Sequence, residues 1–469
     1  MDKNTITRFA PSPTGPMHIG NARTALFSYL YARKMEGKFY FRIEDTDRER
    51  YDAKSEGQIL DNLDWLGIKF DKFGEDTRGY LIQSERLDKY RQIANELVEK
   101  GIAYKCYCTK QRLEELRKKQ STEGKPTIYD RRCCDATNPN DSSEFVVRLK
   151  IPQDEIIEFN DLVRGKISFA GKDLDDSVLL KSDGFPTYHL AAAVDDHEMG
   201  VTHVLRAEEW LSSTPKHIVI YKAMDWNTPE FGHFSLILGA DKTKLSKRHG
   251  ATSVRELRDQ GYLPEALVNF MALLGWNPKS EEELFTLSEL EDRFDLEGIN
   301  RAPAVFDIEK LNYFNRYYIA KSENKKLIDL LRINTEKTSL ETAEKIVELV
   351  KQRMDKLSDF NKLSHYFFTP PKIITEDLVF IKSTKSSAKK GLEIAAKELE
   401  KAKKIDKLEL KSAFESAVLR NKISNGDLFW SLRFTLTGEK KSPPPEEIIP
   451  IIGRQEALER INSAVELLK

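Results

Sequence analysis

Apolar and polar residues follow two different patterns in the two halves of the chain. In the first half, short apolar runs such as KFYFRI (38–43) have strand character, and segments such as 85–104 have helical spacing. The second segment places its apolar side chains on one helical face: Leu87, Tyr90, Ile93, Ala94, Leu97 and Val98. Strands that alternate with helices are typical of a parallel sheet, so we predict an α/β fold for this half.

A β-rich block interrupts this alternation. It contains three strand-like stretches, EFVVRLKIP (144–152), EIIEFNDLVRGKISFAG (155–171) and DSVLLKSDG (176–184). The strand and helix pattern resumes at VTHVLR (201–206) and TPKHIVIYKAMDW (214–226). The order predicts a domain inserted into the parallel sheet.

From about Ser322 onward the sequence is helix-like and rich in Lys and Glu. Its breakers are TPPK (369–372) and SPPP (442–445). We therefore predict a separate all-helical region. A chain of 469 residues with 40% apolar residues is long enough for about three domains.

Composition adds constraints on location and partners. The longest apolar run, LVNFMALLGW (267–276), is far shorter than the ~20 residues that span a bilayer, and the polar start MDKNT lacks a signal-peptide pattern. All four cysteines lie within 106–134, unlike a secreted disulfide framework, so we expect a cytoplasmic protein that does not act at membranes. The net charge of −1 neither favours nor excludes RNA binding.

The opening stretch RFAPSPTGPMHIGN (8–21) suggests a phosphate site. A strand, a turn with Gly15 and Gly20, and a helix beginning near Asn21 would direct free backbone N–H groups and a positive helix end at an anion. His18 could then donate to a phosphoryl oxygen. The alternative is an irregular loop in which His18 is an ordinary surface residue.

A basic stretch, DKTKLSKRHG (241–250), strengthens this interpretation. Lys244, Lys247 and Arg248 surround the small Ser246. A solvated loop is the alternative, but two phosphate-binding elements in one split α/β domain could hold a nucleotide triphosphate and stabilise a phosphoryl transition state.

These stretches resemble class I aminoacyl-tRNA synthetases of the bacterial glutamyl type. PSPTGPMHIGN is similar to the HIGH motif, with Asn21 at its last position, and KLSKR is similar to the KMSKS motif. The resemblance continues through RIEDTD (42–47), YLIQSERLDKY (80–90), FPTYHLAAAVDDHEMGVTHVLRAEEWLSSTPKH (185–217), PAVFDIEKL (303–311) and LRFTLTGEKKSPPPEEIIPIIG (432–453), and so covers the whole chain.

The resemblance implies a Rossmann-type α/β catalytic domain with an inserted α+β acceptor-binding domain, followed by an all-α anticodon-binding region. The implied segments are 1–83 and 188–240 for the two catalytic halves, 84–187 for the insert, 241–321 for the KMSKS loop and stem-contact domain, and 322–469 for the anticodon-binding region. The lysine-rich stretch 382–411, with ten Lys against five acidic residues, would contact tRNA phosphates, although most charged helices are simply solvated.

The implied reaction has two steps. The α-carboxylate of L-glutamate attacks the α-phosphate of Mg²⁺-bound ATP to give glutamyl-adenylate, and a ribose hydroxyl of tRNA(Glu) then accepts the glutamyl group. We expect a monomer. Charge stabilisation and positioning would perform most of the catalysis.

Site residues follow from the same resemblance. Arg8 would bind the side-chain carboxylate of glutamate and Glu44 its amino group, with Ala10, Ser12, Tyr188 and Arg206 completing the pocket. The two basic groups Lys244 and Lys247 would act in catalysis with His18. The nucleotide would contact His18, Gly20, Asn21, Glu209, Trp210, Lys244, Ser246, Lys247 and Arg248. An ordinary Arg8–Glu44 surface pair and a core role for Tyr188 are the alternatives.

Some family members hold a structural zinc with a C-x-C…C-x-H set. Here CYC (106–108) and CCD (133–135) are separated by 24 residues, so the implied ligands of Zn²⁺ are Cys106, Cys108, Cys133 and Asp135, with Cys134 as an alternative fourth ligand. Four unligated thiols are the other possibility.

Three rival functions remain open at this point. A glutaminyl-tRNA synthetase would have a β-barrel anticodon region, and a truncated relative that glutamylates a tRNA base would lack the C-terminal region. An inactive RNA-binding paralogue would have lost His18, Lys244 or Lys247. The sequence leaves undecided whether tRNA(Gln) is also charged, whether glutamate activation requires tRNA, and which residues contact the anticodon.

Overall fold

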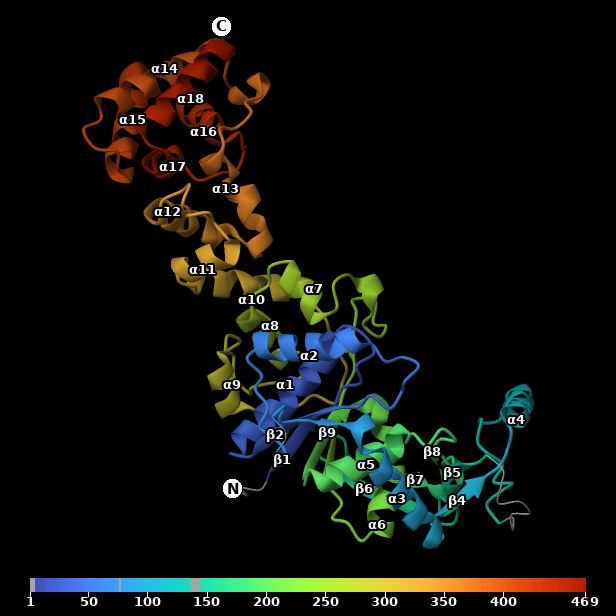
Figure 1. The fold of residues 1–469 in the computed structure, drawn as a ribbon. Coiled ribbons are helices and arrows are strands. Elements are labelled where there is room, and N and C mark those ends of the chain that lie inside the picture. Colours follow the sequence, from blue (N-terminus) through green and yellow to red (C-terminus); the bar gives the residue numbers. More distant parts are fainter. Residues whose placement is uncertain (1–4, 76, 136–143) are drawn as a thin grey trace. The chain divides into compact units, whose positions relative to one another are not determined.

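The computed structural model describes residues 5–75, 77–135 and 144–469. The chain forms two compact units. The first comprises Met1–Asp259 and Pro264–Leu311, and the second comprises Gln260–Leu263 and Asn312–Lys469. Figure 1 labels the elements of both units.

Parallel strands form the framework of the first unit (Figure 1). One sheet has the order β1-β2-β3, with β1 (Ile6–Phe9), β2 (Lys38–Ile43) and β3 (Leu81–Ile82) all parallel. A second sheet pairs β9 (His203–Ala207) with β10 (Glu230–Phe234), also in parallel. The amide of Thr202 donates to the carbonyl of Ile6 at 3.0 Å, so the start of β9 lies beside β1. The predicted parallel α/β arrangement is confirmed.

Helices alternate with these strands. The helix α1 starts at Ile19, two residues earlier than expected, because the preceding residue His18 is extended and accepts at its ring from the Gly20 amide. The helices of this unit are α1 (Ile19–Lys34), α2 (Ala53–Trp65), α3 (Leu87–Glu99), α4 (Lys110–Thr122), α5 (Tyr188–Glu198), α6 (Thr214–Ala223), α7 (Val254–Asp259), α8 (Pro264–Leu273) and α9 (Leu287–Arg293).

The β-rich block divides between two sheets. Its first and last strands, β5 (Val146–Leu149) and β8 (Val178–Leu180), join β4 (Ala103–Cys106), which precedes the block at the end of the 85–104 segment predicted as a helix. The three form an antiparallel sheet in the order β4-β5-β8. Its central strands, β6 (Ile156–Asp161) and β7 (Gly165–Ala170), form a hairpin in which β6 pairs in parallel with β10. The hairpin therefore extends the sheet of β9 and β10, although it belongs to the segment 84–187 that was predicted as the insert.

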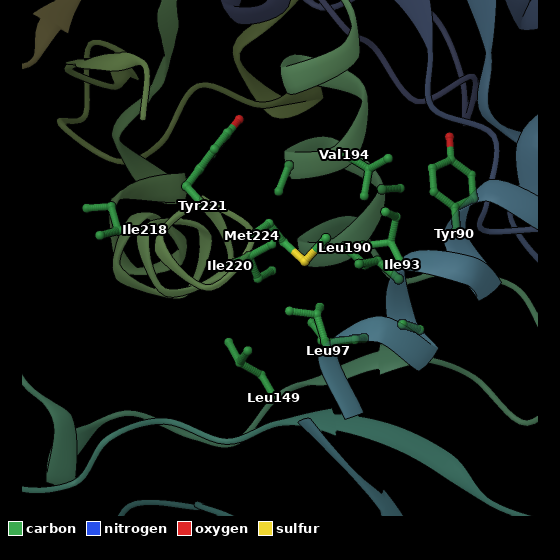
Figure 2. Packing of buried hydrophobic residues seen from close by; sticks show 14 of the residues in the cluster. Tyr90, Ile93, Leu97, Leu149, Leu190, Val194, Ile218, Ile220, Tyr221 and Met224 are labelled. Atoms are coloured by element: carbon green, nitrogen blue, oxygen red, sulfur yellow. The ribbon is translucent and has the colours of Figure 1, made fainter. Parts of the chain in front are cut away.

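One hydrophobic core cluster of the first unit joins its helices to the antiparallel sheet. Figure 2 shows side chains from α3, α5 and α6 packed together with Leu149 of β5. The labelled members are Tyr90, Ile93, Leu97, Leu149, Leu190, Val194, Ile218, Ile220, Tyr221 and Met224. The apolar face predicted for the 85–104 helix is thus the face that α3 buries, with Tyr90, Ala94 and Leu97 fully inaccessible to solvent.

The second unit is helical. The described chain beyond β12 (Ala304–Val305) contains no strand, which confirms the all-helical prediction for this part. Its helices begin within α10 (Ile308–Lys321) and continue with α11 (Asn324–Leu331), α12 (Leu340–Val350), α13 (Phe360–Phe368), α14 (Lys385–Lys401), α15 (Lys407–Asn421), α16 (Ser431–Thr437), α17 (Pro445–Ile452) and α18 (Arg454–Leu467). The core packs apolar side chains of α14 to α18, including Leu392, Phe414 and Ile461.

Gly391 of α14 allows a close helix crossing. A Cβ at this position would lie 2.1 Å from the carbonyl oxygen of Asp427, at the π-helical turn Gly426–Trp430. Because backbone must move to admit a methyl group, Gly391→Ala is expected to destabilise the second unit by about 1–3 kcal/mol. Urea unfolding measures this change, with Ser386→Ala, at an exposed position of the same helix, as the control. Equal stability of the two variants would contradict the proposed crossing constraint.

No helix among the described residues is long and apolar enough to cross a bilayer.

Candidate active site

Two segments far apart in sequence meet at the start of α1. The amide of Ile19 donates to the carbonyl of Thr252 at 2.9 Å, and the amide of Val254 donates to the carbonyl of Met17 at 3.0 Å. These bonds pair the MHI stretch with the residues that follow the basic loop 241–250. The two candidate phosphate-binding elements are thereby held next to each other.

A pocket of about 200 Å³ opens between these elements. Five of the residues predicted to contact a nucleotide line it, namely His18, Gly20, Asn21, Glu209 and Lys244. Lys244 Nζ lies 2.6 Å from a carboxylate oxygen of Glu209, and both side chains are largely exposed. Glu209, which follows β9, therefore pairs with Lys244 beside this pocket.

His18 is held as a neutral ring with one nitrogen free to donate. Burial and the nearby Lys244 charge lower the pKa of His18, which favours the neutral ring at pH 7. Its Nδ1 accepts from the Gly20 amide at 3.2 Å. The neutral tautomer that accepts at Nδ1 carries its proton on Nε2, so Nε2 is the atom that can donate to a ligand.

Two other loop residues predicted to contact the nucleotide, Ser246 and Arg248, do not line this pocket. Arg248 pairs with Asp241 at 3.1 Å, and the amide of Ser246 donates to His249 Nδ1 at 3.0 Å. Lys247 begins the short helical turn Lys247–His249, and its side chain lies outside what the structure describes. Asp241 and His249 thus form hydrogen bonds and ion pairs with each other and with other residues of the same loop.

A second pocket, of about 210 Å³, adjoins the first and shares Asn21, Ala207 and Glu209 with it. All six residues predicted to bind glutamate line this pocket: Arg8, Ala10, Ser12, Glu44, Tyr188 and Arg206. Trp210, predicted near the nucleotide, lines this second pocket as well, and its ring centroid lies 4.2 Å from that of Tyr188.

Buried side chains of alternating charge connect Arg8 and Glu44, two residues that line the second pocket. Asp196 accepts from Arg8 Nε at 2.9 Å and from Arg42 NH1 at 2.7 Å, and Arg42 NH2 donates to Glu44 Oε1 at 2.8 Å. Burial alone would raise the pKa of Asp196, but the two guanidinium groups hold it below its ordinary value. Burial raises the pKa of Glu44, and Arg42 opposes that shift. The network is thus a buried, paired array with Arg8 and Glu44 at its two ends.

Arg8 keeps part of its guanidinium available. Its Nε and NH2 atoms both pair with Asp196, at 2.9 and 3.3 Å, which uses the side of the guanidinium. Its NH1 approaches the carbonyl of Leu205 only at 3.5 Å. The end-on pair of N–H groups on NH1 and NH2 is therefore the part that can bind a carboxylate.

Three thiols and a phenol form a cluster away from both pockets. Cys106, Cys108 and Cys133 lie close enough to share a metal ion, and Sγ of Cys108 is 3.6 Å from Sγ of Cys133. The Tyr129 hydroxyl lies 3.4 Å from Cys106 Sγ and 3.3 Å from Cys108 Sγ. None of the four cysteines forms a disulfide.

Neither residue predicted as a fourth ligand belongs to this cluster. Asp135 is exposed and lies 3.3 Å from Lys150 Nζ, and Cys134 Sγ accepts from Arg131 at 3.4 Å. Tyr129 was missed because spacing between cysteines and acidic residues carries no signal for a tyrosine.

Other site residues were also missed by sequence reasoning. Arg23, within the largely buried α1, lines the first pocket and donates to the carbonyls of Ser235 and Leu274. Asp196 and Arg42 were missed too, and a signal for both existed: Asp and Arg within otherwise apolar segments must find partners when buried.

The comparisons with known proteins agree with this geometry. Residues 4–313 match the family model "tRNA synthetases class I (E and Q), catalytic domain", and residues 318–465 match "Anticodon binding domain". The chain is 42% identical to a glutamate–tRNA ligase of Carboxydothermus hydrogenoformans, over 97% of this chain and 98% of that protein. It is 40% identical to glutamate–tRNA ligase 2 of Thermoanaerobacter pseudethanolicus, over 98% of each.

A solved structure is similar over the same length. The crystal structure of a glutamate tRNA ligase from Elizabethkingia meningosepticum in complex with its amino acid has a TM-score of 0.89 and 34% sequence identity, and the match covers 99% of this chain and all of that one.

Proposed function

Because the chain belongs to the class I tRNA synthetases for glutamate and glutamine, we propose that its second pocket binds L-glutamate and its first pocket binds ATP. The protein is a glutamate–tRNA ligase, which joins L-glutamate to tRNA(Glu) at the expense of ATP through glutamyl-adenylate. The observation that carries the pocket assignment is the convergence of Arg8, Glu44, Tyr188 and Arg206 on one cavity beside the His18 pocket.

The charges of the second pocket match glutamate. The end-on N–H groups of Arg8 pair with the side-chain carboxylate, and the Glu44 carboxylate accepts from the α-ammonium group. Arg42 binds Oε1 of Glu44, so Oε2 is the oxygen that meets the substrate. An uncharged glutamine side chain would forgo the ionic pairing with Arg8, which is the basis for choosing the acid over the amide.

The first pocket then places the α-phosphate next to the attacking carboxylate. His18 Nε2–H and Lys244 donate to phosphate oxygens as charge develops, and the N-terminal end of α1 faces the same anion. Mg²⁺ accompanies ATP in this family and neutralises its phosphate charge. Attack of the α-carboxylate on the α-phosphate releases pyrophosphate. A ribose hydroxyl of tRNA then attacks the carbonyl of the adenylate, forms the ester and releases AMP and a proton.

The substrate assignment is tested by ATP–pyrophosphate exchange, measured with and without tRNA and with glutamate or glutamine. Exchange that depends on glutamate supports the proposal. Exchange with glutamine at equal efficiency would contradict the role of Arg8. Charging of tRNA(Glu) and tRNA(Gln) in parallel decides which tRNAs are substrates.

The tRNA contacts are proposed on the same basis. Residues 84–187 guide the acceptor end, residues 241–321 contact the stem, and residues 322–469 contain the anticodon-binding region, with the lysine-rich helices α14 and α15 among its elements. We also propose that the enzyme is a monomer and acts in the cytoplasm.

We further propose that the thiol cluster holds one structural Zn²⁺. Three thiols within reach of one ion and a fourth oxygen donor fit the four-coordinate sites that zinc prefers. Cys106, Cys108 and Cys133 would be ligands, and the Tyr129 hydroxyl is the oxygen nearest to them in this structure. When bound, the ion would link β4 to the segment around residue 133 in the predicted acceptor-binding domain.

Elemental analysis of protein purified without added metal is expected to find about one zinc per chain, because one tetrahedral site uses four ligands. Cys106→Ser should lower this content. Among the candidate fourth ligands, Tyr129→Phe should accelerate zinc release to a chelator, whereas Asp135→Ala and Cys134→Ser should not.

Loss of the metal should impair aminoacylation while ATP binding is retained, since the cluster lies outside both pockets. A zinc content near zero in freshly purified, reduced protein would contradict the proposed zinc site.

A further inference from the structure

A buried chain of hydrogen bonds leads from the β6–β7 hairpin to the second pocket. Asp161 Oδ2 lies 2.5 Å from His233 Nδ1, and His233 Nε2 lies 3.0 Å from Arg206 Nε. Arg206 NH1 then donates to the Tyr188 hydroxyl at 2.7 Å. Of these four hydrogen-bonded residues, Arg206 and Tyr188 line the pocket, whereas Asp161 and His233 lie behind it.

The first link fixes which nitrogen of His233 carries the proton. Asp161 Oδ1 accepts from the amides of Val163 and Arg164, at 3.0 and 2.9 Å, so that oxygen is committed to the hairpin turn. Oδ2 is left for the imidazole. Burial would raise the pKa of Asp161, but His233 and the backbone amides hold it below its ordinary value, and burial lowers the pKa of His233. An ionised carboxylate beside a neutral imidazole requires the proton on Nδ1.

The second link fixes Arg206. With its proton on Nδ1, His233 presents a lone pair at Nε2, which accepts from Arg206 Nε. Arg206 NH2 donates to the Trp210 carbonyl at 3.2 Å and to Thr214 Oγ1 at 2.8 Å. These bonds hold the guanidinium plane, so NH1 is directed at Tyr188 and the pocket. No carboxylate among the described residues pairs with Arg206, so its orientation depends on the imidazole.

We propose that Asp161 and His233 form a positioning dyad for the amino-acid substrate, in which the carboxylate sets the imidazole tautomer and the imidazole orients Arg206 and Tyr188. The inference rests on the proposed assignment of glutamate to the second pocket. Both residues act through Arg206 and contact no substrate. The β6–β7 hairpin accordingly supports the amino-acid site from behind the residues that line it, although it lies within the segment predicted to bind the tRNA acceptor end.

Asp161→Asn tests the dyad with minimal change in shape. The backbone amides of Val163 and Arg164 would keep the side-chain oxygen of Asn at the Oδ1 position. The new side-chain NH₂ group then faces His233, and Nδ1 must accept its hydrogen bond. The proton then moves to Nε2, where it opposes the Arg206 Nε–H, as when the carboxylate of a catalytic triad becomes an amide. We expect KM for glutamate to rise about tenfold, the scale of one charge-assisted hydrogen bond, and KM for ATP to change less than about twofold.

The assay is aminoacylation with tRNA present, varying glutamate and ATP separately, together with thermal unfolding. Glu158→Gln is the matched control, because Glu158 lies on the same strand, is exposed, and pairs with Lys166. ¹⁵N-histidine NMR should show the His233 proton on Nδ1 in the parent protein and on Nε2 in Asp161→Asn. The His233 signals are identified by their loss in His233→Gln.

His233→Gln provides a second, independent arm in case Asp161→Asn does not fold. Its amide oxygen can accept from Arg206, so it should raise KM for glutamate less than His233→Leu does. Unchanged KM for glutamate in every variant, or an equal rise for glutamate and ATP, would overturn the dyad. Failure of the parent protein to charge tRNA with glutamate would instead overturn the proposed function.

Discussion

Lys247→Ala is expected to slow glutamyl-adenylate formation by about 10²–10³-fold, the scale for loss of one group that stabilises transition-state charge. Lys247 follows Lys244 and Ser246 in the loop that is bonded to the His18 segment through Thr252 and Val254. A second ammonium beside the phosphates would act chiefly on kcat, because the charge it stabilises develops only as the α-phosphate is attacked.

Single-turnover measurement of adenylate formation checks this expectation. Lys242→Ala is the matched control, since Lys242 belongs to the same loop but was not predicted to contact the nucleotide. The control should stay within about twofold of the parent rate if only the general charge of the loop is lost. Equal rates for the Lys247→Ala variant and the parent protein would exclude Lys247 from catalysis.

Arg8→Ala is expected to raise KM for glutamate by about 10²-fold, because a bidentate, charge-assisted contact to one substrate is lost. KM for ATP should change little. The structure adds a second consequence, since Arg8 also neutralises Asp196, and removing it leaves that buried carboxylate with Arg42 alone. We therefore expect the alanine variant to be less stable, by up to about 3 kcal/mol.

Arg8→Lys separates the two effects. A lysine ammonium can remain beside Asp196 but cannot offer two parallel N–H groups to the substrate. This variant should keep most of the stability and still lose affinity for glutamate. Arg33→Lys, at a half-buried arginine paired with Asp71 outside the pocket, controls for the substitution itself. If KM rises equally for both substrates, general damage explains the result.

Local sequence patterns predicted the parts of this protein that depend on neighbours along the chain. The strand, the turn and the N-terminal end of α1 occupy one continuous stretch, so residue spacing alone placed His18 and Gly20 at a helix N-terminus. The face that α3 buries followed from its 3.6-residue period in the same way. Family resemblance then supplied six of the residues that line the second pocket.

Only the tertiary structure decided which buried polar groups are partners. Arg8 pairs with Asp196, which lies 188 positions away in the sequence. Arg206 of β9 depends on His233 of the neighbouring strand β10, and His233 depends on Asp161 of β6, the next strand in the same sheet. Tyr129 reaches the thiols only because the chain folds back there. Periodicity reports whether a residue is buried, but a buried charge takes its partner from whichever element packs against it, and that choice is made by the packing of the sheets and helices.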